Sequence, residues 1–162
     1  MGGNKGFTLI ELMIVVALIA IIAAIAIPNL LRSRMSANEA GAAGAMRTLA
    51  TAETQFQVAA FLDANGDGTG DYGTLANLAN PDGAGASPGF IDSVLGTGSK
   101  SGYAYTVVTV AGGAAAAPAF TVQATPSAPG RSGYRRYFVD DTGVIRFTSD
   151  GTAATVASSP LN

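Results

Sequence analysis

The sequence predicts an α+β fold in which one long N-terminal helix packs on an antiparallel sheet of roughly four strands. Three observations predict it: an apolar run over residues 7–27, a helical stripe of apolar residues over 42–59, and strand-like segments within 103–148. The chain has 162 residues, which suits one domain of ordinary size. Because part of it is committed to the apolar run, we expect a small water-soluble core.

The first element is the apolar run, in which only Thr8 and Glu11 are polar from Phe7 to Ile27. A helix of about 20 residues spans roughly 30 Å, the thickness of a bilayer core, so the run can cross a membrane. A cleaved secretory signal would have a basic region before a shorter apolar core and small residues at its cleavage site. Here Lys5 alone precedes the run and Pro28 follows it, so that interpretation fits poorly.

The beginning of the chain resembles the signature of type IV prepilins and of the related pseudopilins of type II secretion. The resemblance rests on residues 1–6, the sequence Phe7-Thr8-Leu9-Ile10-Glu11-Leu12 and the apolar run that ends at Pro28. It implies that a prepilin peptidase cuts after Gly6, removes residues 1–6 and methylates Phe7. It also implies a pilin-like fold, a precursor in the inner membrane with its head in the periplasm, and an assembly platform that builds a homopolymeric filament from it.

Glu11 is the anomaly of the run, because a carboxylate in apolar surroundings is costly unless it is paired. Cleavage at Gly6 would create a cationic amine on Phe7, four residues away. When subunits dock with an axial offset, the amine of one can meet the Glu11 carboxylate of its neighbour, which relieves both desolvation penalties and fixes the register. The resemblance implies the same role for Glu11, and the alternative is a carboxylate solvated in the headgroup layer. Pro28 removes one helical hydrogen bond and should bend the helix, so we assign it to assembly as well.

The helical pattern continues past the run, and we expect one helix from about Phe7 to about Leu62. Its first half is apolar all round and belongs in the membrane or filament core, whereas its second half is amphipathic and packs on the head. We therefore divide the chain into a leader (1–6), a transmembrane or filament-core helix (7–34), an amphipathic continuation (35–62) and a globular head (63–162). The apolar stripe consists of Ala42, Ala45, Leu49, Ala52, Phe56 and Ala59.

In the head, residues 63–101 are rich in Gly, Asn, Asp and Ser, which predicts loop with one helical turn at 74–78. Strand signals follow at residues 103–110, 120–125, 134–139 and 144–148. The last two strands are joined by the turn Asp140–Gly143, where glycine can adopt a positive φ. We expect the tail, 151–162, to be irregular.

The loop that opens the head carries acids at the spacing of a calcium loop, with Asp63, Asn65 and Asp67 at alternate positions and Asp71 at the ninth. The twelfth position holds Thr74 in place of the bidentate Glu, which weakens the prediction. Either Ca²⁺ gathers these side chains or they form a solvated surface turn.

The amino-acid composition argues against several classes of function. The chain has no Cys and no His, so it lacks disulfides, thiolate nucleophiles, imidazole bases and the ligands that zinc prefers. A net charge of -2 does not favour nucleic acid as the main partner. We assign no catalytic residue and predict a structural subunit of a cell-surface pilus rather than an enzyme. The alternatives are a periplasmic pseudopilin of type II secretion and a membrane-anchored, calcium-dependent binding module.

Overall fold

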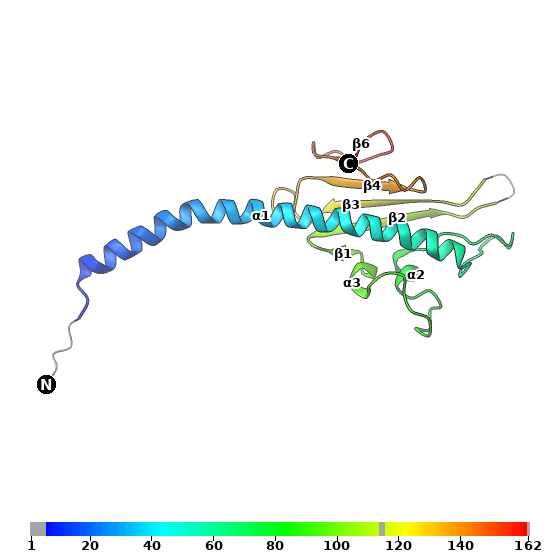
Figure 1. The fold of residues 1–162 in the computed structure, drawn as a ribbon, viewed down its shortest axis with the longest axis horizontal. Helices are drawn as coiled ribbons and strands as arrows, with labels where there is room; N and C mark the ends of the chain where they lie inside the picture. The colour runs from blue at the N-terminus through cyan, green and yellow to red at the C-terminus, as the bar shows by residue number, and fades with distance from the viewer. Residues whose placement is uncertain (1–5, 114–115, 162) are drawn as a thin grey trace. The chain divides into compact units, whose positions relative to one another are not determined.

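Helix α1 (Leu9–Val58) is the first element of the chain, and it runs through Pro28 without a break. The computed structural model describes residues 6–113 and 116–161. The chain consists of two compact units, Met1–Arg34 and Met35–Asn162. All other elements belong to the second unit (Figure 1). They are the helices α2 (Leu75–Ala79) and α3 (Ser93–Gly96) and the strands β1 (Ser99–Lys100), β2 (Tyr103–Val110), β3 (Ala119–Pro126), β4 (Arg136–Asp140), β5 (Arg146–Thr148) and β6 (Ser159–Pro160).

In the first unit, α1 is long and apolar enough to cross a membrane. An 18-residue window of it has a mean hydropathy of 3.0, and none of that window is buried. Its large side chains are exposed all round the helix, as Ile10 (66%) and Ile25 (65%) illustrate. A surface of this kind needs an apolar environment, supplied by lipid or by another protein.

The sheet of the second unit is an antiparallel meander in which the strands follow one another in the order β1-β2-β3-β4-β5-β6. The four predicted strands correspond to β2, β3, β4 and β5, and two edge strands of two residues each were not predicted. The predicted turn between β4 and β5 is present: Gly143 has a φ of 72° and its N–H donates to the carbonyl of Asp140 at 2.9 Å. The α+β prediction is therefore confirmed, with six strands in place of about four.

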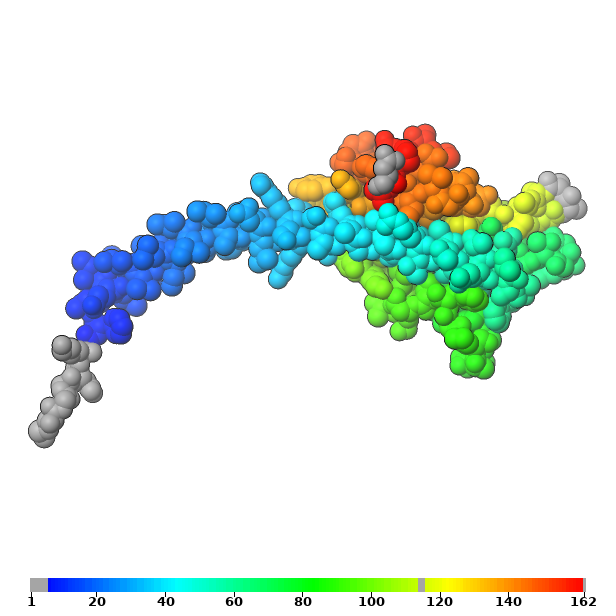
Figure 2. Space-filling view, in the orientation of Figure 1, coloured from blue at the N-terminus to red at the C-terminus, as the bar shows by residue number. Residues whose placement is uncertain are grey.

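The core of the head forms where residues 42–56 of α1 lie against one face of the sheet. Met46, Leu49 and Phe56 are fully or almost fully buried there, as are Tyr103 of β2 and Val122 of β3. Figure 2 shows this part of α1 in cyan, bordered by the orange C-terminal strands on one side and by green loop segments on the other. The helix thus serves as one layer of the head.

The prediction for the end of the helix was wrong. The stripe is buried from Ala42 to Phe56, but Ala59 is exposed because α1 ends at Val58. Ala60 then adopts a φ of 51°, in the left-handed region, and turns the chain into the following loop.

Candidate functional site

The N-terminus of α1 is closed by a capping box formed by Thr8 and Glu11. The backbone N–H and the hydroxyl of Thr8 both donate to Oε2 of Glu11, each at 2.8 Å. In return, the N–H of Glu11 donates to the Thr8 hydroxyl at 3.3 Å. This reciprocal pattern satisfies donors that a helix N-terminus leaves without partners. This role of Thr8 and Glu11 was not predicted from the sequence, although Thr-x-x-Glu is the recognised signature of a capping box.

The capping box leaves part of the Glu11 carboxylate available. Both bonds that Glu11 accepts end on Oε2, and no described residue donates to Oε1. Glu11 is also exposed. One carboxylate can therefore cap its own helix with Oε2 and accept a second partner on Oε1.

The predicted cleavage point lies directly before this cap. Gly6 and Phe7 precede the helix, and the Phe7 side chain is 89% exposed. A peptide bond outside regular structure is easier for a protease to bind in extended form than one inside a helix. The geometry therefore suits cleavage between Gly6 and Phe7.

Residues 1–27 match a family model described as the prokaryotic N-terminal methylation motif. The N-terminus of the chain therefore carries the motif that is the hallmark of type IV pilins and pseudopilins. The resemblance noted from residues 1–12 and from the apolar run that ends at Pro28 is confirmed. The match includes Gly6, Phe7 and Glu11 and stops one residue before Pro28. No curated protein and no solved structure matches the chain significantly.

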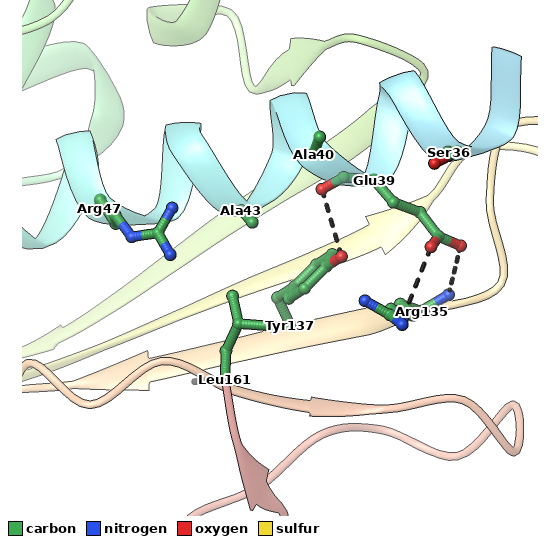
Figure 3. A pocket seen from close by; sticks show the side chains of 8 residues that line it. All are labelled: Ser36, Glu39, Ala40, Ala43, Arg47, Arg135, Tyr137 and Leu161. Atoms are coloured by element: carbon green, nitrogen blue, oxygen red, sulfur yellow. Dashed lines mark hydrogen bonds and ion pairs between the residues drawn. The ribbon is translucent and has the colours of Figure 1, made fainter. Parts of the chain in front are cut away.

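In the pilin-like head, a cavity of about 290 Å³ lies between α1 and the sheet (Figure 3). On one side of it, Oε1 of Glu39 accepts the backbone N–H groups of Tyr134 and Arg135 at 2.8 and 3.2 Å. The Nε of Arg135 lies 3.6 Å from the other carboxylate oxygen, and the Tyr137 hydroxyl donates to the Glu39 carbonyl at 3.2 Å. These contacts tie the helix to the start of β4. Arg47 lies on the opposite side of the cavity.

The acidic loop is folded around its own backbone. Oδ1 of Asp63 accepts the N–H groups of Gly66 and Asp67 at 2.7 and 3.2 Å, and Oδ2 accepts that of Gly68 at 3.0 Å. Gly66 and Gly68 have φ values of 72° and 81°, which glycine adopts without steric cost. Asn65 accepts the N–H of Asp67 at 2.8 Å. The loop therefore has the tight turns that its glycines predict.

Asp71 joins the acidic loop to the hairpin formed by β2 and β3. Its side chain is almost fully buried and accepts the N–H groups of Ala64 and Gly112, each at 2.9 Å. Among the described residues, no group of three or more Asp, Glu, His or Cys side chains could hold a metal ion. The assignment of Asp63, Asn65, Asp67 and Asp71 to calcium thus stays a prediction.

We expect about 1 mM Ca²⁺ to raise the melting temperature of the head, residues 35–162, if the loop binds the ion, because a ligand that binds only the folded state stabilises it by mass action. Asp67→Ala should abolish the increase, whereas Asp82→Ala, in a different turn, should retain it. Differential scanning calorimetry measures both. A wild-type melting curve that Ca²⁺ leaves unchanged would rule out the calcium site.

Proposed function

We propose that the protein is the structural subunit of a type IV pilus-like filament. The observation that carries the proposal is the methylation motif over residues 1–27, which coincides with an exposed apolar helix and a capped Glu11. The part of the head that follows the helix, residues 63–162, is about 100 residues long and rich in loops, which favours a pilin over a pseudopilin of type II secretion. In this proposal the chain is the substrate of its peptidase, and its own role is structural.

The proposed sequence of events begins with a precursor anchored in the inner membrane by the first half of α1, with its head in the periplasm. Prepilin peptidase hydrolyses the bond between Gly6 and Phe7, which frees the Phe7 amine for methylation. The assembly platform then moves the subunit from lipid into the filament. There the apolar side chains of α1 exchange lipid contacts for contacts with neighbouring helices.

Glu11 determines the register of that packing in this proposal. Oε1 would receive the Phe7 amine of an adjacent subunit while Oε2 keeps its bonds to Thr8. A buried ion pair contributes more to specificity than to net stability, because the desolvation of both charges offsets their attraction. Subunits in any other register would leave one amine and one carboxylate buried without a partner, at a cost of several kcal/mol.

The test is mass spectrometry of the protein in surface fibres sheared from the native host. We expect its N-terminus to be methylated Phe7, with residues 1–6 absent. A methylated Phe7 on a protein that never enters sheared fibres would favour the pseudopilin. Retention of residues 1–6 on a protein confined to the membrane would contradict the filament and favour a membrane-anchored binding module.

A further inference from the structure

Glu53 is a carboxylate buried in the core of the head. It lies on α1, its exposed fraction is 0%, and Oε2 accepts the backbone N–H of Gly73 at 3.0 Å. Oε1 is buried and has no hydrogen-bond partner among the described residues. An ionised carboxylate with one oxygen in this state lacks the solvation that its charge requires.

The segment that supplies the Gly73 amide, residues 62–74, is packed tightly on the end of α1, and we call it the covering loop. A Cβ atom on Gly70 would lie 2.0 Å from the carbonyl oxygen of Gln57, and one on Gly73 would lie 3.0 Å from the Phe56 ring. The centroid of the Tyr72 ring lies 4.7 Å from the centroid of the Phe120 ring. Glycines at these two positions therefore allow the loop to approach the helix closely enough to cover Glu53.

The covering loop also holds the tip of the β2–β3 hairpin. Asp71 accepts the N–H of Gly112, and the side-chain amide of Asn65 donates to the carbonyl of the same residue. Asp71 additionally accepts the N–H of Ala64 within the loop. A change in the packing of the loop would therefore alter the surface that it forms with the hairpin.

The groups around Glu53 do not neutralise its charge. Among the described residues, the ion pairs are Lys100–Asp92 and Arg135–Glu39, and neither includes Glu53. Tyr72 of the covering loop is close enough to Glu53 for their charges to interact, and Asp141 of the β4–β5 turn acts on the same tyrosine. Burial raises the pKa of Tyr72, and the negative charges of Asp141 and Glu53 raise it further.

We propose that Glu53 is a proton-operated latch for the covering loop: the protonated carboxyl lets the loop pack on α1, and ionisation favours an open loop in which water solvates the carboxylate. Burial raises the pKa of Glu53 from 4.5 to about 7, and the Gly73 N–H acts in the opposite direction. The packed state therefore binds the proton more tightly than the open state does. The population of the open loop should rise roughly tenfold per pH unit between about 4.5 and about 7 and then level off.

Hydrogen exchange of the full chain in detergent micelles tests the latch. The buffer contains EDTA, so that no bound cation holds the loop, and rates are corrected for intrinsic exchange at each pH. The amides of Asp71 and Gly73 should lose protection by roughly tenfold per pH unit from pH 5 towards 7. Glu53→Gln keeps an acceptor for Gly73 without the charge and should abolish this dependence. Asp82→Asn, in a different turn, should retain it.

Three results would overturn the latch: pH-independent protection in the wild type, an unchanged slope in Glu53→Gln, or an equal loss of protection at Val122 of β3, which would indicate global unfolding. The ¹³C shift of the Glu53 carboxyl in the wild type gives a readout that does not depend on how well the variant folds. Its titration should have a midpoint near 7, and a midpoint near 4.5 would contradict the latch. The latch concerns the head alone and does not rest on filament assembly.

Discussion

Replacing Glu11 with leucine should leave membrane insertion intact and abolish filament formation. The variant makes the run over residues 7–27 more apolar, so the helix inserts at least as well. In the filament, the Phe7 amine of the neighbouring subunit would be buried without its partner, which costs about 3–5 kcal/mol. That is a loss of roughly a hundredfold to several thousandfold in association per contact. Electron microscopy of surface filaments, with immunoblots of the membrane fraction, measures both outcomes.

Two further variants separate the charge of Glu11 from its capping role. Glu11→Gln preserves the capping box, because glutamine is equally suited to that position, but it removes the charge. Thr8→Ala disrupts the cap and keeps the charge. If the intersubunit pair governs assembly, Glu11→Gln should fail as leucine does and Thr8→Ala should assemble. Normal filaments from Glu11→Leu, or rescue by glutamine, would show that the charge is dispensable.

Replacing Leu49 with alanine should destabilise the head by about 2–5 kcal/mol, the usual cost of a cavity at a fully buried leucine. Leu49 is 0% exposed on the face of α1 that packs on the sheet. Leu30→Ala is the matched control, because it makes the same change in the same helix at a side chain that is 54% exposed. Denaturant titration of the full chain in micelles, followed by near-UV circular dichroism of tyrosine, measures the two unfolding free energies. Equal losses would contradict the assignment of this part of α1 to the head core.

The middle of α1 and the long strands could be predicted from local sequence patterns. The C-terminal end of α1 and the two-residue strands could not. The stripe from Ala42 to Phe56 follows the helical period, and residues 103–110 are rich in β-branched and aromatic side chains. Alanines at 59 and 60 favour a helix, but the chain turns there, and the Asp71 N–H then bonds to the carbonyl of Leu62. Such tertiary contacts outweigh the helix propensity of the two alanines. Strands of two residues, such as β1, are too short to show a period.

The functional residues, too, could be predicted only in part from the sequence. Glu11 stood out because a single carboxylate in an apolar run is costly, yet its bonds to Thr8 were missed. Glu53 resembled the other charges among the alanines of α1. Its burial depends on the path of residues 62–74, which no periodic pattern specifies. Residues whose roles arise from loop packing therefore become visible only in the structure.

A density map of the assembled filament tests the intersubunit ion pair most directly. We predict the Phe7 nitrogen of one subunit within about 4 Å of the Glu11 carboxylate of its neighbour, the distance that defines an ion pair. Thr8 should still donate to the other carboxylate oxygen. A map in which Glu11 faces solvent, or contacts only the Thr8 of its own chain, would contradict the proposed mechanism of assembly.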